Sequence, residues 1–264
     1  MKYYSKKYLQ QQYKKIFLNK IVPKKRKLKI LIGPPASGKG TVMNKYRLLN
    51  KYTIMISYDD IIHNNPAYIR EKNKLKDKNE LQKLYFKYRS EVYDIDNILH
   101  EKIIKKGYSI LWETTGVNID YMYNWFYELK KKNYDIDVHI LCIDEKLLYN
   151  RILERARKIG QEPAPRKQIE NEYYKSYKNI SLILPYINKL TLYDNSETLQ
   201  KILIIGSYYK VQCLCKISDS TISLLTKILP DDIMRGIRYS NSCITKSKYI
   251  TRPHIFYVKR SVKS

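Results

Sequence analysis

The segment that most constrains the fold of this chain is a glycine-containing loop, GPPASGKGT, at residues 33–41. It follows a short apolar run at 28–32 and precedes a segment of helical character at 41–49, which is the order of a phosphate-binding loop. In such a loop the glycines let backbone N–H groups converge on one anion, and the following helix adds the positive end of its dipole. The sequence therefore predicts that Lys39 and the loop backbone bind the phosphates of a nucleoside triphosphate.

The position after the lysine departs from the usual motif. It normally offers a hydroxyl to Mg²⁺, but here it is Gly40, and the hydroxyl comes one residue later on Thr41. Loops that end in GKGT occur in small nucleotide kinases, where the metal can be held mainly through water. We therefore expect ATP and Mg²⁺ as cofactors, with Thr41 as the candidate metal ligand. The nucleotide-binding residues are predicted to be Gly33, Ser37, Gly38, Lys39, Gly40 and Thr41.

Two aspartates follow the next strand-like run, at 52–57. An acid just past the carboxyl end of a parallel strand lies in the crevice where such sheets bind ligands. Asp59 is therefore expected to face the phosphates, in a catalytic or Mg²⁺-positioning role. The alternative is the N-cap of the helix that follows, and Asp59 and Asp60 could each take one of these roles.

Further polar side chains end the strands at 108–112 and 136–143. The first strand ends in Glu113, Thr114 and Thr115, a candidate site for the acceptor or for metal-bound water. After the second strand, a helix expected at 145–158 carries Arg151, Arg155 and Lys158, with Arg157 and Arg166 nearby. Arginines in this place commonly neutralise a transferring phosphoryl group in kinases, and a solvated basic face is the alternative.

The order of elements predicts an α/β fold of the P-loop, three-layer type. It has a mostly parallel sheet and basic N- and C-terminal extensions. The divisions are a basic helical extension at 1–26, a kinase domain at 27–199 and a small basic module at 200–264. The last core strand is expected at 190–194, and the pattern weakens beyond it. The remaining predictions are helices at 2–20, 79–106 (one helix or two), 118–132, 168–183 and 220–229, and strand-like pieces at 202–206, 209–216 and 254–259.

The net charge of +26 is concentrated at the two ends of the chain. Residues 1–58 contain 15 Lys and Arg and no acid, and residues 201–264 contain 12 against three acids. Such flanks attract polyanions, nucleic acid first, although a Lys- and Tyr-rich composition is also what an AT-rich genome would encode. No apolar run reaches the 18 or so residues of a membrane span. We expect a soluble, cytoplasmic protein without a membrane partner, and a nuclear location stays open.

The ordered combination of these motifs resembles the zeta toxin family of P-loop kinases over residues 28–195. The resemblance is carried by GPPASGKGT, ISYDDIIHNNP, GYSILWETTG, KKKNYDIDVHILCID and the arginine-bearing helix that follows. The loop alone is shared with very many families, whereas its combination with ETTG is more specific. Members of the family use ATP and Mg²⁺ to phosphorylate a hydroxyl, best known on UDP-N-acetylglucosamine.

The resemblance implies a role for each matching position. Lys39 would hold the phosphates, Asp59 would be the base and Thr115 would touch the acceptor. Asp60 and Glu113, at the ends of their strands, are further candidate substrate contacts. Arg155 and Arg166 would serve the γ-phosphate. The chain departs from the family pattern at Val117, at Asn97 and at Gln161, where the family often has arginine, an acid and arginine. These departures bear on the acceptor more than on the nucleotide.

The sequence therefore predicts a kinase that transfers the γ-phosphoryl group of ATP to a hydroxyl of a small molecule, with a nucleotide-sugar as the first acceptor. One alternative is a polynucleotide 5′-hydroxyl kinase, favoured by the basic flanks and disfavoured by the near-neutral middle of the chain. Another is a non-catalytic protein that binds ATP and nucleic acid.

Overall fold

One mixed sheet organises the chain. The computed structural model describes residues 4–18, 23–159, 166–178, 180–196, 200–205, 210–214, 217–246 and 255–257. Its strands are β1 (Lys27–Ile32), β2 (Ile54–Met55), β3 (Ile110–Thr114), β4 (Asp135–Cys142), β5 (Lys189–Asp194), β6 (Gln200–Ile205), β7 (Lys210–Cys213) and β8 (Ile255–Tyr257). They form an eight-stranded sheet in the order β2-β3-β1-β4-β5-β6-β7-β8. The first five strands in this order are parallel and the last three pair antiparallel, which confirms the mostly parallel α/β fold.

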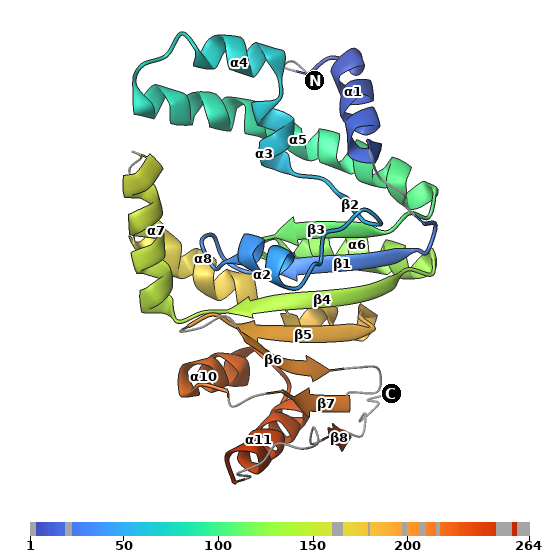
Figure 1. Cartoon of the computed structure of the whole chain (residues 1–264), viewed down its shortest axis with the longest axis vertical. Helices are drawn as coiled ribbons and strands as arrows, with labels where there is room; N and C mark the ends of the chain where they lie inside the picture. The colour runs from blue at the N-terminus through green and yellow to red at the C-terminus, as the bar shows by residue number, and fades with distance from the viewer. Residues whose placement is uncertain are drawn as a thin grey trace.

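Helices cover both faces of the sheet and make the three layers (Figure 1). They are α1 (Lys6–Phe17), α2 (Lys39–Lys45), α3 (Tyr58–His63), α4 (Pro66–Lys72), α5 (Lys78–Lys105), α6 (Ile119–Lys131), α7 (Glu145–Ile159), α8 (Arg166–Lys178), α9 (Ile180–Ile183), η1 (Leu184–Tyr186), α10 (Asp219–Ile228) and α11 (Asp231–Lys246). None of the described helices is long and apolar enough to cross a membrane.

The two faces of the sheet bury cores of different size. Alternate residues of β1 point to opposite faces, so that Ile30 belongs to the large core beneath α5 and α6 and Leu31 to a small core beneath α2. The small core contains Val42 from α2 and Leu141 from β4. The short helix α2 is therefore fixed over the sheet by apolar contacts, which sets the position of the loop that precedes it.

The helix predicted near the N-terminus is confirmed as α1, and it packs on the domain. The Tyr8 hydroxyl donates to the backbone oxygen of Ile61 at 2.6 Å, and the Tyr4 hydroxyl donates to that of Tyr88 at 3.2 Å. Both tyrosine rings are buried, and burial raises the pKa of each phenol. Tyr8 of this basic helix and Tyr4, just before it, thus stabilise α3 and α5, which stand above the sheet in Figure 1.

The prediction that 190–194 is the last core strand is wrong. β6 pairs antiparallel with β5, and β7 and β8 continue the same sheet. The side chain of Asp194 also accepts hydrogen bonds from Ser218 at 2.7 Å and Thr221 at 2.8 Å, which hold the start of α10 against β5. The proposed divisions at 26/27 and 199/200 stay predictions. The helices α4 and α11 were not predicted, because the pattern of α4 is short and α11 lies in the weakly patterned C-terminal part. α3 was expected only as the helix that follows Asp59 and Asp60.

Candidate nucleotide-binding site

The glycine loop joins the end of β1 to the start of α2. Ala36 and Gly38 both have positive φ angles, 61° and 100°, and turn the backbone so that the loop wraps round a central space. Gly38 is the N-cap of α2 and provides no side-chain cap. The first N–H groups of a helix have no partner within the helix. The backbone amides that open α2 are thus suited to an anion.

Close neighbours explain why two loop positions are glycine. A Cβ at Gly33 would lie 2.7 Å from the hydroxyl of Ser37. A Cβ at Gly38 would collide with the side-chain amide of Asn195, which donates to the backbone oxygen of Ser37 at 2.7 Å. Asn195 follows β5 and supports the loop from below. Its role was not predicted, although a polar run just past the end of a strand is the signal that identified Asp59 and Glu113.

Lys39 is held inside the loop. Its ammonium donates to the backbone oxygens of Gly33 at 2.8 Å and Pro34 at 3.1 Å, and lies 3.8 Å from the carboxylate of Glu113. The Lys39 side chain is only 10% exposed. Burial lowers its pKa, the positive charge of Arg155 adds to this, and Glu113 opposes it. The two carbonyl oxygens carry only partial negative charge. A bound triphosphate would bring full negative charges to the Lys39 ammonium.

Proton uptake should therefore accompany ATP binding at alkaline pH. The lowered pKa of Lys39 means that its ammonium begins to lose its proton below the ordinary value of 10.5, whereas bound phosphates favour the charged form. As pH rises toward that value, a growing share of the free protein must gain a proton to bind ATP. Calorimetric titrations in buffers of different ionisation enthalpy should show uptake that increases with pH. Uptake of equal size in Lys39→Met would show that another group is responsible.

The polar end of β3 adjoins the loop. Gly33 donates its N–H to the backbone oxygen of Thr114 at 3.3 Å, and the Thr114 hydroxyl accepts from the N–H of Gly116 at 3.2 Å. Gly116 has a φ of 80°, and a side chain there would collide with Ile32 and with the backbone of Ser176. This tight turn leaves Glu113 and Thr115 half-buried at the carboxyl edge, with the Glu113 carboxylate directed at Lys39.

The two aspartates lie in the first turn of α3, and both are exposed. The alternative that one of them caps this helix is wrong. Ser57 is the N-cap, and its hydroxyl accepts from the N–H of Asp60 at 3.2 Å. The Asp59 carboxylate instead accepts a hydrogen bond of 2.6 Å from the hydroxyl of Tyr85 on α5. Burial and this bond raise the pKa of Tyr85, so its hydroxyl stays protonated and remains a donor at neutral pH.

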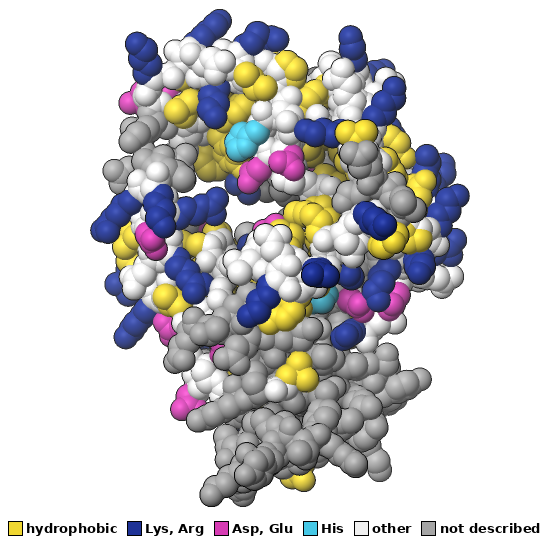
Figure 2. Space-filling model, viewed as in Figure 1, with side chains coloured by type: hydrophobic (Ala, Val, Ile, Leu, Met, Phe, Trp, Pro, Cys, Tyr) yellow, Lys and Arg dark blue, Asp and Glu magenta, His cyan; other side chains and the backbone are white. Residues whose placement is uncertain are grey.

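The arginines of α7 and α8 lie in different surroundings. Arg151 donates to the backbone oxygen of Asn195 at 3.1 Å, and Arg155 is exposed on α7, close enough for its charge to lower the pKa of Lys39. Arg166 begins α8, pairs with Glu170 at 2.9 Å and lies over the ring of Tyr149. Figure 2 shows a hollow between the helices above the sheet and the sheet itself, with acidic side chains of α3 on its upper rim and basic side chains of α7 at its side. Gln161 lies outside the described residues.

The remaining polar positions bear on the metal and the acceptor. The buried hydroxyl of Ser37 has no hydrogen-bond partner among the described residues, which fits a loop built for a ligand. Thr41 is exposed in the first turn of α2 and offers the hydroxyl oxygen that Mg²⁺ prefers. No three His, Cys, Asp or Glu side chains cluster as a metal site within the described part of the chain. Asp96 is buried on α5 beside His100, at 3.0 Å, and faces away from solvent.

Comparisons with known proteins bear on the family and the fold of the chain. The family model for zeta toxins matches residues 13–202. Among solved structures, the chain is similar to one from the PezAT chromosomal toxin-antitoxin system of Streptococcus pneumoniae, at 17% identity and a TM-score of 0.59, over 74% of this chain and 81% of that one. It is also similar to the AvrRxo1-ORF1:-ORF2 structure with ATP, at 10% identity and a TM-score of 0.56, over 90% of this chain and 84% of that one.

These two structural likenesses have low identity and show the fold alone, and no curated protein matches the chain in sequence. The family match, by contrast, covers well over half of the 264 residues and includes the loop, both acidic strand ends and α7. The chain therefore belongs to the zeta toxin family and is a nucleotide-binding P-loop kinase.

Proposed function

We propose that this kinase transfers the γ-phosphoryl group of ATP to a hydroxyl of a nucleotide-sugar, with UDP-N-acetylglucosamine as the first acceptor. The observation that carries the transfer step is the position of Lys39, which is buried in the loop 3.8 Å from Glu113 and within the field of Arg155. The choice of acceptor rests on membership of the zeta toxin family. Phosphoryl transfer depends mainly on positioning and charge neutralisation, and these charges converge where the phosphates would lie.

Each residue has a role in the proposed reaction. Lys39 and the loop amides bind the phosphates, and Thr41 would hold Mg²⁺, which would supply charge neutralisation at the phosphates. Asp59 takes the proton of the acceptor hydroxyl as its oxygen bonds to the γ-phosphorus. The bond from that phosphorus to the bridging oxygen breaks, and ADP leaves. Asp60, Glu113 and Thr115 orient the acceptor.

Arg155 and Arg166 are proposed to neutralise the transferring group. Arg155 already acts on Lys39 through its charge. The side chain of Arg166 is 71% exposed, and its pairing with Glu170 is a surface ion pair. Such pairs contribute at most about 1 kcal/mol, so exchanging Glu170 for a phosphate would cost little.

Tyr85 should act as a positioning residue through Asp59. Tyr85→Phe keeps the buried ring and removes the hydroxyl that donates to the Asp59 carboxylate at 2.6 Å. A hydrogen bond to a charged group is worth about 1.5–3 kcal/mol, so kcat should fall by about tenfold or more while the KM for ATP changes little. A loss in the double variant with Asp59→Asn no greater than the loss in Asp59→Asn alone would support action through Asp59, whereas losses that multiply would contradict it.

The acceptor is identified by comparing the rate of ADP release with different hydroxyl compounds. The panel contains UDP-N-acetylglucosamine, the free sugar and a single-stranded oligonucleotide with a 5′-hydroxyl. Release that depends on the nucleotide-sugar supports the proposal. Release that depends only on the oligonucleotide favours the polynucleotide alternative. That alternative is considered because residues 1–58 contain 15 basic residues and no acid, and basic segments bind phosphate backbones.

A further inference from the structure

A polar surface occupies the sheet face that carries α2. In Figure 1, α2 lies over the carboxyl half of β1, β3 and β4. Toward the amino ends of the strands, the side chains on this face are charged. Lys29 of β1 is in register with Asp137 of β4, which is in register with Lys189 of β5. Charged side chains in three adjacent strands are unusual in a packed core, so this half of the face is suited to a polar ligand.

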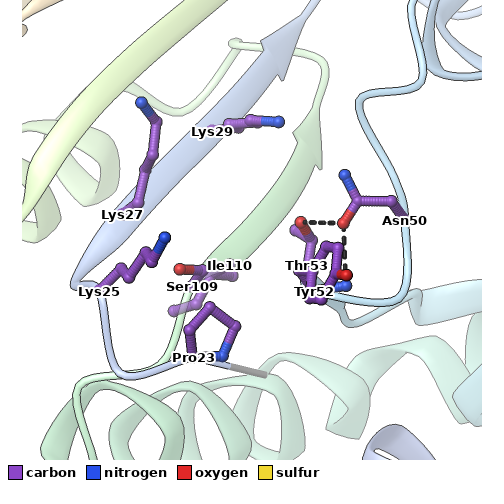
Figure 3. A pocket seen from close by; sticks show the side chains of 9 residues that line it. All are labelled: Pro23, Lys25, Lys27, Lys29, Asn50, Tyr52, Thr53, Ser109 and Ile110. Carbon is purple, nitrogen blue, oxygen red and sulfur yellow. Dashed lines mark hydrogen bonds between the residues drawn. The ribbon is translucent and has the colours of Figure 1, made fainter. Parts of the chain in front are cut away.

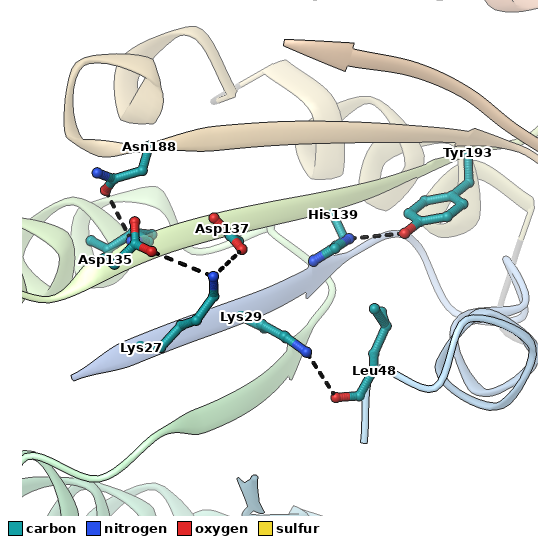
Figure 4. A network of polar contacts seen from close by, with 9 residues as sticks. Lys27, Lys29, Leu48, Asp135, Asp137, His139, Asn188 and Tyr193 are labelled. Atoms are coloured by element: carbon teal, nitrogen blue, oxygen red, sulfur yellow. Dashed lines mark hydrogen bonds and ion pairs between the residues drawn. The ribbon is translucent and has the colours of Figure 1, made fainter. Parts of the chain in front are cut away.

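One lysine of this surface is neutralised within the protein. Lys27 pairs with Asp137 at 3.0 Å and with Asp135 at 3.4 Å, and these two contacts raise its pKa against the effect of burial (Figure 4). Farther along the sheet, a ring nitrogen of His139 on β4 and the hydroxyl of Tyr193 on β5 form a hydrogen bond of 2.9 Å. Lys27 is therefore part of the protein's own network and is not available to a ligand.

A cavity of about 400 Å³ lies beside this network (Figure 3). Lys25 and Lys29 border it from the β1 side, Asn50, Tyr52 and Thr53 from the segment before β2, and the remaining lining residues are Pro23, Lys27, Ser109 and Ile110. In Figure 3 the ammonium groups of Lys25 and Lys29 point toward the space between these walls. This volume falls in the range of small-molecule sites and could hold a single nucleotide unit.

Neither of the two lysines that face the cavity forms an ion pair with a described carboxylate. No ion pair within 4.0 Å involves Lys25 or Lys29 among the residues that the structure places, and the Lys29 ammonium makes a long contact of 3.4 Å with the backbone oxygen of Leu48. Burial lowers the pKa of Lys29, the positive charges of Lys27 and Lys189 add to this, and the negative charge of Asp137 opposes it. An anion in the cavity would relieve the repulsion between these positive groups.

An aromatic ring provides the second recognition element. Tyr52 is 48% exposed at the cavity, and the ammonium of Lys51 lies 5.1 Å from its ring centroid. Its backbone N–H donates to the side chain of Asn50 at 2.9 Å, which fixes the segment that carries the ring. Exposed aromatic rings beside lysines bind nucleobases by stacking while the lysines contact phosphate.

We propose that this cavity binds a nucleotide, with its phosphate at Lys25 and Lys29 and its base against Tyr52. The nucleotide could be free or part of a single strand, because both present the same phosphate and ring. The site is distinct from the kinase centre. It lies at the amino ends of β1 and β3, whereas ligands of open α/β sheets, and the glycine loop here, lie at the carboxyl ends. Lys29, the cavity residue nearest the loop in sequence, lies four residues before Gly33, a separation of roughly 13 Å along the extended strand.

The test is calorimetric titration of the full chain, with the glycine loop saturated by a non-hydrolysable ATP analogue. The probes are inorganic phosphate, thymidine 5′-monophosphate and a 5′-phosphorylated hexathymidylate at low salt. We expect the thymidylate probes to bind more tightly than phosphate. Lys25→Gln with Lys29→Gln should weaken their binding at least tenfold, and Tyr52→Ala at least fivefold. Equal affinity of the two thymidylate probes would identify a free nucleotide, and tighter binding of the hexamer would identify a single strand.

The matched control removes two positive charges from a part of the chain outside the cavity. Lys6→Gln with Lys7→Gln changes two exposed lysines of α1 that do not line the cavity, and its affinities should stay within twofold of the wild type. ADP release by the kinase should be unchanged in all these variants, which separates this proposal from the proposed function. The proposal is overturned if no probe binds the wild type, if the control weakens binding as much as the cavity variants, or if phosphate binds as tightly as the thymidylates.

Discussion

Replacement of Asp59 by asparagine is expected to lower kcat by about 10² to 10⁴, which is about 3 to 5 kcal/mol of transition-state stabilisation. The substitution keeps the size of the side chain and an oxygen that can accept from the hydroxyl of Tyr85, but it removes the base. Asp59 is exposed in the first turn of α3, so the fold should persist and ATP should still bind. Steady-state rates with an identified acceptor, together with ATP affinity, provide the measurement.

Two further substitutions test whether the effect is specific to Asp59. Asp60→Asn removes an adjacent charge in the same helical turn and should raise the KM for the acceptor more than it lowers kcat. Glu80→Gln changes an acid in the first turn of α5 and should leave both constants unchanged. If kcat is insensitive to Asp59→Asn but falls sharply in Asp60→Asn, then Asp60 is the base and Asp59 is the acceptor contact. If neither substitution matters, the base lies elsewhere, and Glu113 is the next carboxylate to replace.

Replacement of Lys39 by alanine should abolish the stabilisation of the protein by ATP. At 100 times its dissociation constant, ATP should add about 2.7 kcal/mol to the free energy of unfolding of the wild type. For a chain of this size, this corresponds to a rise in melting temperature of roughly 5 to 10 °C. Without the ammonium, the phosphates lose their buried positive charge, and kcat should also fall by about 10² or more. Thermal melts with and without MgATP measure the first effect.

The control for Lys39 is Lys45→Ala, at the other end of the same helix. Lys45 is exposed in the last turn of α2 and outside the glycine loop. Its substitution should leave the shift in melting temperature with ATP intact. If Lys39→Ala keeps the full shift, ATP binds elsewhere and the assignment of the loop is wrong.

The parts of the fold and site that could be predicted are those encoded locally. The glycine loop has a fixed spacing, and the order of strand, loop and helix from β1 to α2 follows directly from it. The expected strand ends at Asp59 and Glu113 could be found because each follows an apolar run. Glu113 and Lys39 do meet, at 3.8 Å, because parallel strands bring their carboxyl ends to one edge of the sheet.

The missed features depend on contacts between distant segments. Asn195 supports Ser37 across 158 residues, and Tyr85 donates to Asp59 across 26. Nothing in the spacing of the sequence brings these pairs together. The wrong assignment of an N-cap had a different cause, because Ser57 and the two aspartates are all good capping residues and only the backbone shows which one starts α3. β6 was not recognised as part of the sheet because a short apolar run does not specify its partner strand.

The most direct test of the account is phosphorus NMR of the protein with ATP, Mg²⁺ and UDP-N-acetylglucosamine, with the remaining acceptors of the panel in parallel. The account predicts that the γ-phosphate resonance of ATP disappears while ADP and a new phosphomonoester resonance of the acceptor grow in equal amounts. Asp59→Asn should slow both changes together. Binding of ATP without transfer to any acceptor would contradict the account and identify the protein as a non-catalytic nucleotide-binding member of its family.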